Sequence, residues 1–212
     1  MLNIQRLTFN PFQVNTFVLW DETKECAIVD AGCYGTAEQE ELTGFISKHN
    51  LKPVKLINTH CHIDHIAGTA FTSRAYQVDF MAHEGGIRLI RHAEKAGFIY
   101  GFEKLETIDP KILLKEGDIV KFGNTELLVI ETPGHADGSV CFISHKEKFV
   151  ITGDVLFHQS IGRSDLPTGN YEVLMKSIRE KLLTLPPEYK VYPGHGPETT
   201  IGYEAYSNPF LG

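Results

Sequence analysis

The 212-residue sequence contains no apolar run long enough to span a membrane, so no helical membrane anchor is expected. Its first residues lack a basic segment followed by an apolar one, and we therefore expect no signal peptide. Positive charge is also scarce, because 20 Lys and Arg face 27 Asp and Glu and give a net charge of -7. This balance disfavours a nucleic-acid partner, which usually needs a basic surface. The composition predicts a soluble globular enzyme with neither a nucleic-acid nor a membrane partner.

Cysteine is sparse as well, and none of the four cysteines has the C-x-x-C spacing of a metal or redox motif. This usage favours a cytoplasmic location. Cys61 lies between two histidines, and in an extended segment its side chain should point away from theirs. We expect it to be a small core residue. A disulfide between any pair of cysteines remains open at this level.

The densest group of potential metal ligands is the stretch HCHIDH at residues 60–65. It follows the apolar run 54–57, which predicts a strand, and precedes residues 66–71, which predict the entry to a helix. Neutral imidazole and carboxylate bind first-row metal ions well. His60 and His62 should project to the same side of an extended segment, whereas Asp64 and His65 come after the chain has begun to turn. The spacing therefore predicts two neighbouring metal positions.

Three further predicted strands, at residues 127–130, 148–151 and 190–192, each end in a turn with glycine or proline and one good ligand. These ligands are His135, Asp154 and His195. A single His or Asp after a strand usually belongs to an ordinary turn. Five histidines and two aspartates at four strand ends are not expected from turn chemistry, so the set predicts a metal site.

The order of these motifs resembles the metallo-β-lactamase superfamily, and the segments 28–32, 132–139, 153–154 and 193–196 are similar to its glyoxalase II branch. The resemblance covers nearly the whole chain. It implies one metallo-β-lactamase-like domain over residues 1–212 with an α/β (α+β) fold, a four-layer αββα sandwich. The chain ends at Gly212, so the C-terminal helical domain of glyoxalase II is expected to be missing. The family's tyrosine after the last metal histidine is also replaced, by Gly196-Pro197-Glu198.

Carried over residue by residue, the resemblance assigns the ligands of two divalent ions, with zinc expected and iron or manganese as alternatives. The first ion takes His60, His62 and His135, the second takes Asp64, His65 and His195, and Asp154 bridges them. Asp30 matches a position that supports the metal loops. Two such ions would lower the pKa of bound water from about 15.7 toward roughly 7 and polarise a carbonyl, which supplies a hydroxide nucleophile. Asp64 and Asp154 are the expected catalytic carboxylates.

The resemblance implies a thioesterase that cleaves S-lactoylglutathione or a related acyl thioester. Arg163 is the candidate substrate-binding residue, because a guanidinium suits the carboxylate of glutathione, although it could instead pair with Asp165 or cap a helix. A second interpretation is a persulfide dioxygenase with one iron at positions matching His60, His135 and Asp154. Hydrolysis of another ester, lactone or lactam and a non-catalytic binding module are further alternatives.

Strands are expected at residues 4–9, 14–20 and 26–29, and helices at 36–49, 85–96 and 171–183. Hairpin turns are expected at 122–125 and 145–147. Strands followed by helices, twice over, predict two packed sheets with helices outside. Three other histidines, His83, His92 and His145, are expected at the surface. His158 is expected either there or facing the cleft.

Overall fold

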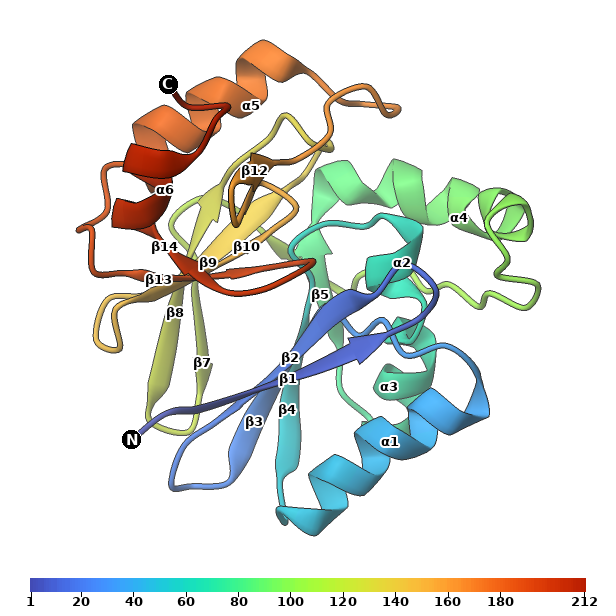
Figure 1. Ribbon diagram of the computed structural model, residues 1–212. Helices are drawn as coiled ribbons and strands as arrows, with labels where there is room; N and C mark the ends of the chain where they lie inside the picture. The colour runs from blue at the N-terminus through green and yellow to red at the C-terminus, as the bar shows by residue number, and fades with distance from the viewer.

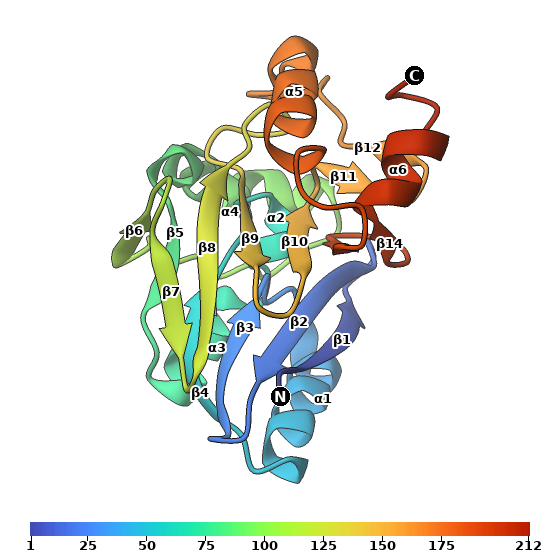
Figure 2. The same ribbon diagram turned by 90° about the vertical axis from the view of Figure 1, so that its left-hand side faces the viewer.

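The computed structural model describes all of residues 1–212, and it contains two facing six-stranded sheets with helices on their outer sides (Figures 1 and 2). The first sheet has the strand order β1-β2-β3-β4-β5-β6 and the second β14-β13-β10-β9-β8-β7. This is the four-layer arrangement predicted from the sequence. The first sheet comprises β1 (Asn3–Phe9), β2 (Val14–Trp20), β3 (Glu25–Val29), β4 (Lys52–Ile57), β5 (Phe80–His83) and β6 (Ile112–Leu114).

The second sheet is built from β7 (Ile119–Phe122), β8 (Thr125–Glu131), β9 (Val140–Ser144), β10 (Phe149–Gly153), β13 (Lys190–Pro193) and β14 (Thr199–Thr200). A small hairpin, β11 (Leu156–Phe157) and β12 (Ser160–Ile161), follows β10. Strands β7, β8, β9 and β10 form successive antiparallel pairs, and both predicted hairpin turns lie between them. Strand β13 then returns parallel to β10.

The helices divide between the two outer layers. The first sheet is covered by α1 (Gly35–Lys48), α2 (Ile63–Ile66), α3 (Thr69–Tyr76), the short 3-10 turn η1 (Glu84–Gly86) and α4 (Ile87–Ile99) (Figure 1). The second is covered by α5 (Tyr171–Ser177), its π-helical continuation η2 (Ile178–Leu182) and α6 (Ile201–Ser207). None of these helices is long and apolar enough to cross a membrane.

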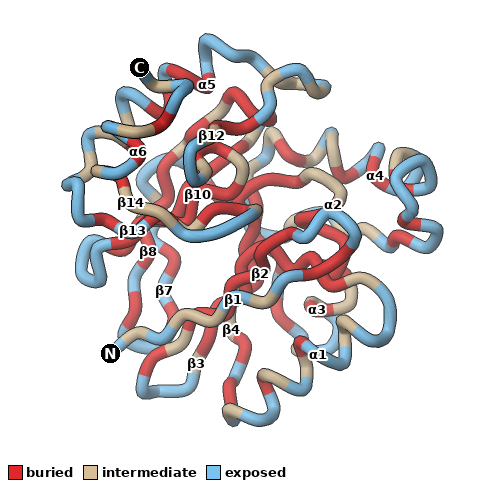
Figure 3. Tube along the Cα trace, in the orientation of Figure 1, coloured by how far each residue is buried: buried red, intermediate tan, exposed pale blue.

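Three buried clusters fill the spaces between the four layers, and Figure 3 shows burial running along the strands of both sheets. The cluster between the sheets includes Phe17, Leu127 and Phe142, none more than 1% exposed. The outer clusters pack the first sheet against its helices and the second against α5, η2 and α6. Apolar burial of this extent is the main stabilising term of such a domain.

The short C-terminal helix α6 was not predicted, because its position depends on contacts remote in sequence. Glu204 is fully buried in it and accepts hydrogen bonds from Gln159 N at 2.9 Å and Asn208 Nδ2 at 2.8 Å. Thr199 Oγ1 donates a further bond at 2.5 Å. A buried carboxylate is tolerated here because its oxygens are well supplied with donors.

Candidate metal centre

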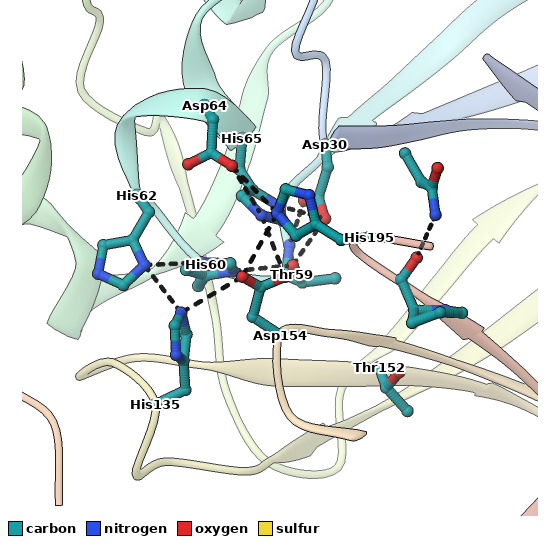
Figure 4. Close-up of polar contacts among 12 residues, drawn as sticks. Asp30, Thr59, His60, His62, Asp64, His65, His135, Thr152, Asp154 and His195 are labelled. Carbon is teal, nitrogen blue, oxygen red and sulfur yellow. Dashed lines mark hydrogen bonds and ion pairs between the residues drawn. The ribbon is translucent and has the colours of Figure 1, made fainter. Parts of the chain in front are cut away.

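The predicted ligands meet where the strands of the two sheets end. Strands β3 and β4 are parallel, as are β10 and β13, so the turns after each pair emerge at one edge. The stretch 60–65 follows β4, His135 follows β8, Asp154 follows β10 and His195 follows β13. Figure 4 shows these side chains converging on one another from the separate turns. The carboxyl ends of strands are the usual location of sites in such sheets.

His60, His62 and His135 form a first group whose ligand atoms all lie within 4.8 Å of one another. Nδ1 of His62 lies 3.0 Å from Nε2 of His60 and 2.9 Å from Nε2 of His135. Three imidazole nitrogens at such distances face a common point. Burial and, to a smaller extent, neighbouring histidines together lower the pKa of His62 to about 4 and that of His60 well below its usual value. Neutral imidazoles are the form that binds a metal ion.

Asp64, His65 and His195 form a second group, again within 4.8 Å. Oδ2 of Asp64 lies 3.2 Å from Nε2 of His195 and 3.6 Å from Nε2 of His65. Burial would raise the pKa of Asp64, but His65 and His195 lower it below its usual value. This group therefore combines an ionised carboxylate with two imidazoles, a typical donor set for a divalent first-row ion.

Asp154 lies between the two groups. Its Oδ2 is 3.6 Å from Nε2 of His135, in the first group, and 3.5 Å from Nε2 of His195, in the second. Its Oδ1 is 3.3 Å from Nε2 of His65. The backbone at Gly194 packs directly against this carboxylate, since a Cβ on Gly194 would overlap Asp154 Oδ1 and lie 2.8 Å from His65 Cε1. One carboxylate is thus within reach of ligands on both sides.

Two buried atoms show that this donor set fits metal ions. Nε2 of His65 and Oδ1 of Asp154 are both inaccessible and have no hydrogen-bond partner. Buried polar atoms in native proteins are nearly always hydrogen-bonded, so these two, which face each other at 3.3 Å, suit a cation held by both. Burial would lower the pKa of His65, but Asp154, Asp64 and Asp30 raise it well above its usual value. The surroundings of His65 therefore favour positive charge, and seven side chains are available there as metal ligands.

Asp30 supports the site from outside both groups, as the resemblance implied. It is fully buried, and its Oδ1 accepts a hydrogen bond from Thr59 N at 2.7 Å. Its Oδ2 accepts from Thr59 Oγ1 at 2.7 Å and lies 3.0 Å from His65 Nδ1. Thr59 has one hydroxyl proton and donates it to Asp30. The contact of 3.2 Å between Thr59 Oγ1 and His60 Nδ1 must therefore have Nδ1 as the donor and the hydroxyl oxygen as the acceptor. Both histidines therefore carry their proton on Nδ1, which leaves Nε2 free for a metal.

Two other histidines are oriented by backbone carbonyls. Nδ1 of His135 lies 2.7 Å from the carbonyl oxygen of Arg163, and Nδ1 of His195 lies 3.3 Å from that of Gln13. A carbonyl can only accept, so each Nδ1 is the donor and each Nε2 faces the ligand group. Partners of this kind fix the tautomer and the ring orientation of metal-binding histidines.

Three buried asparagines near the site escaped the sequence analysis. Asn58 donates to the carbonyl of His65 at 2.8 Å, and Asn10 donates to that of Asp64 at 2.9 Å. Asn15 donates to the carbonyls of Pro193 and Gly196, each at 2.9 Å. Asn58 could have been suspected from its place just before the ligand stretch. The other two lie far away in sequence, and nothing local marks them.

The remaining candidates have mixed outcomes. Arg163 is exposed and binds Asp165 with two hydrogen bonds, at 2.9 and 2.8 Å, so the structure shows the alternative pairing. Cys61 is buried, as expected, and burial raises the pKa of its thiol. His158 is exposed and stacks on Tyr203, with ring centroids 5.2 Å apart.

The expected surface position of His83 is wrong. Its side chain is 19% exposed, and Nε2 lies 3.2 Å from Glu131 Oε1. The reason is that β5 ends against the turn after His135, where a Cβ on Gly138 would lie 2.9 Å from His83 Nδ1, and Gly85 N donates to that nitrogen at 3.0 Å. His92 and His145 are exposed, as predicted.

Comparisons with known proteins agree with this architecture. The chain is 35% identical to the hydroxyacylglutathione hydrolase GloC of Haemophilus influenzae, over 99% of this chain and 98% of that protein. The crystal structure of the BLEG-1 B3 metallo-β-lactamase has a TM-score of 0.90 and 34% identity, covering 100% of this chain and 99% of the other. The di-iron-bound form of TTHA1623 has a TM-score of 0.87 and 33% identity, covering 98% of this chain and 100% of the other.

The family model described as the metallo-β-lactamase superfamily matches residues 9–195, a range that contains all seven predicted ligands. With this match, the two facing sheets and the His/Asp clusters able to bind metal, the chain belongs to the metallo-β-lactamase superfamily and is a metallo-hydrolase.

Proposed function

We propose that this metallo-hydrolase is a glyoxalase II-like thioesterase that cleaves S-lactoylglutathione or a related acyl thioester with two divalent ions, zinc in the first instance. The observation that carries the proposal is the place of Asp154, whose Oδ2 lies 3.6 Å from His135 and 3.5 Å from His195. A carboxylate between two donor groups suits a pair of ions better than a single one. The similarity to GloC over nearly its whole length supports the thioester substrate.

Two ions held by these groups would supply a nucleophile from water at neutral pH and polarise the substrate carbonyl. The chain's own residues prepare the site for that chemistry. Asp154 would hold both ions, and its pKa lies below its usual value because His65 and His195 outweigh the effect of burial, so it stays ionised. Asp64, also ionised, would hold the second ion and accept a hydrogen bond from the attacking water.

The leaving group explains why no strong general acid is needed. A thioester releases a thiolate, which is stable enough to depart without a proton. The donor set accordingly contains ligands and their supporting hydrogen bonds, and no spare acid is required beside them. Arg163 is the candidate contact for a distal carboxylate of the thiol, on the condition that a substrate displaces Asp165 from it.

The test is hydrolysis of S-lactoylglutathione by the full chain loaded with a known amount of zinc. Thiol release is followed with a chromogenic thiol reagent, and metal content is measured on the same sample. We expect about two zinc ions per chain and turnover that disappears in Asp154→Ala. Two bound ions with no turnover of any thioester in a panel of acyl groups and thiols would overturn the substrate assignment. One iron per chain with oxygen consumption on a persulfide would favour the dioxygenase interpretation instead.

Lactam hydrolysis is a second candidate, because a chain of the same length at 34% identity is described as a B3 metallo-β-lactamase. The same zinc-loaded preparation is tested on a chromogenic cephalosporin. A value of kcat/KM for the lactam above that for every thioester would favour this candidate. The opposite order supports the thioesterase.

A further inference from the structure

We propose that two separate segments of the chain position the two ligand groups, so that each segment sets mainly the affinity for one of the two ions. The turn at residues 10–15 would position the second group, and the loop at residues 162–170 the first. Asn10 and Thr168 are the positioning residues. This inference rests on the two-metal function proposed above.

The turn is anchored to Asp64 by a buried side chain. Asn10 is 7% exposed, and its Nδ2 donates to the carbonyls of Gly32 and Asp64, both at 2.9 Å. Its Oδ1 accepts from Phe12 N at 3.0 Å. Each polar atom of the side chain is therefore bonded to backbone, and one of these bonds holds the peptide that carries a ligand. The amide of Asn10 is itself held by both oxygens of Glu38, at 2.9 and 3.0 Å.

The other end of the same turn holds His195. The carbonyl of Gln13 faces His195 Nδ1 at 3.3 Å, and Val14 forms an isolated β-bridge with His195. Asn15 N donates to the carbonyl of Gly194 at 2.7 Å. One six-residue turn thus contacts two ligands of the second group that are remote from each other in sequence. Its shape should set the distance between them.

The first group has its own support. The carbonyl of Arg163 faces His135 Nδ1 at 2.7 Å. Thr168 Oγ1 accepts from Asp137 N at 3.0 Å, and Asn170 N donates to the carbonyl of Gly134 at 2.8 Å. The loop therefore forms hydrogen bonds with His135 and with residues on both sides of it. No hydrogen bond joins this loop to the turn at residues 10–15, which is why the two supports should act separately.

Backbone conformation is unusual in both segments, at Asn10 and Gln13 in the turn and at Thr168 in the loop. Asn10 has φ 55° and Thr168 has φ 73°, both in the left-handed region. Asparagine tolerates that region, but a β-branched residue such as threonine is strained there. Strain of this kind persists only where surrounding contacts enforce it, and it concentrates at functional sites. The bonds on both sides of His135 provide that enforcement for Thr168.

The first experiment replaces Asn10 with glycine, which keeps the left-handed backbone and removes the three side-chain bonds. Metal-free full-length protein is titrated with zinc by calorimetry, and side-chain ¹⁵N NMR of the histidines shows which group fills. We expect the second position to weaken about tenfold, the lower range for loss of a ligand's supporting contact, and the first to stay within about twofold. The control is Lys24→Gly, which replaces a second left-handed residue (φ 69°), this one exposed and in a turn away from the site.

The second experiment addresses Thr168 in the same titration. Thr168→Gly relieves the strain but removes the hydroxyl, so the first position should weaken about tenfold and the second should not. Thr168→Ser retains the hydroxyl and should restore the affinity. Restoration would separate the hydrogen bond to Asp137 from a general effect on the loop.

The outcomes distinguish this inference from the function on which it rests. A wild-type chain that does not bind two ions would overturn both. Two ions bound by the wild type, with equal losses at both positions in either variant, would overturn only the independent positioning. If Asn10→Gly does not fold, Asn10→Asp keeps the volume and the acceptor for Phe12 N while it removes both donors. A normal second affinity in Asn10→Asp would then exclude Asn10 as a positioning residue.

Discussion

Oδ2 of Asp30 lies 3.0 Å from Nδ1 of His65, and both side chains are almost completely buried, at 1% and 0% exposed. The same carboxylate accepts two bonds from Thr59, whose hydroxyl accepts from His60. One residue that is not a ligand therefore fixes the proton positions of a histidine in each group. Supporting carboxylates of this kind also raise the basicity of the ligand.

The first prediction follows from this network. Asn tolerates the left-handed backbone of Asp30 (φ 54°), so Asp30→Asn changes the charge and one acceptor oxygen without adding strain. The single amide oxygen cannot accept all three bonds that the two carboxylate oxygens accept from Thr59 and His65. We expect zinc affinity to fall about 10- to 100-fold, and most at the second position. Competition with a chelator of known affinity measures this, and unchanged affinity at both positions would show that Asp30 only supports the fold.

The second prediction concerns Asp154. Asp154→Ala removes the only carboxylate within reach of His135 and His195 together, so both ions should bind more weakly and turnover should be lost. The fold should persist in part, because the cores between the layers do not involve this side chain. Metal analysis and circular dichroism measure the two effects. Asp79→Ala, at an exposed ion pair with Lys111, is the control. Two tightly bound ions and near-normal turnover in Asp154→Ala would exclude the bridging role.

A third prediction separates the two groups. His195→Ala should weaken the second ion, because Asp64 and His65 would remain with one imidazole fewer. His62→Ala should weaken the first for the same reason. Removal of metal by a chelator should therefore proceed from different positions in the two variants, as read from their histidine NMR signals. Loss of the same ion in both variants would contradict the division into groups.

The fourth prediction is the effect of pH on the metal-free protein. The pKa of His65 is raised well above 6.5 in the folded state, mainly by Asp154 and Asp64 acting against burial. Its stabilising charge is fully present below the unfolded-state value of about 6.5 and is lost as pH rises through the higher folded value. We expect Tm to fall by a few degrees on that rise, since about 2–4 °C corresponds to each kcal/mol in a chain of this size.

Acid should also destabilise the metal-free protein, in this case because Asp154 and Asp64 lose their negative charge. The pKa values of Asp154 and Asp64 are lowered, so their contribution is present above about 3.9 and is lost as pH falls through the folded values. The affinity of the protein for zinc should increase as pH rises, because His65 must release its Nε2 proton before it can bind a metal ion. Thermal melts across pH, with and without zinc, test both signs. A Tm of the metal-free protein that keeps rising above neutral pH would contradict the role of His65.

The sequence predicted which seven side chains come together better than it predicted the residues that support them. The ligands could be predicted because four of them lie within the short stretch 60–65. The other three, His135, Asp154 and His195, follow strands in turns that Gly and Pro mark in the sequence. The αββα layers were likewise predicted from alternating strands and helices. Local pattern could not reveal Asn10 and Asn15, whose partners lie in other turns. Nor could it show that helix 171–183 changes to π-helical geometry or that residues 201–207 form a helix against a buried Glu204.

The same limit explains the outcome for Arg163. Its side chain was predicted as a carboxylate contact from a residue type and a loop position, and Asp165 two residues later supplies a carboxylate within the chain. Exposed ion pairs contribute little free energy, commonly below about 1 kcal/mol, so a substrate carboxylate can compete for the guanidinium. The backbone carbonyl of Arg163 accepts a hydrogen bond from His135 Nδ1, and replacing the side chain with alanine keeps this carbonyl.

The last prediction uses this separation. Arg163→Ala should raise KM for a glutathione thioester with a smaller effect on kcat, because a distal carboxylate contact is made equally in the ground and transition states. A charge-assisted contact is worth roughly 1.5–3 kcal/mol, so kcat/KM should fall about tenfold to hundredfold, and a small thioester without a distal carboxylate should be hardly affected. Asp165→Ala frees the guanidinium and should lower KM for the glutathione thioester alone. Equal losses on both substrates in Arg163→Ala, with no change in Asp165→Ala, would mean that the pair only shapes the loop beside His135.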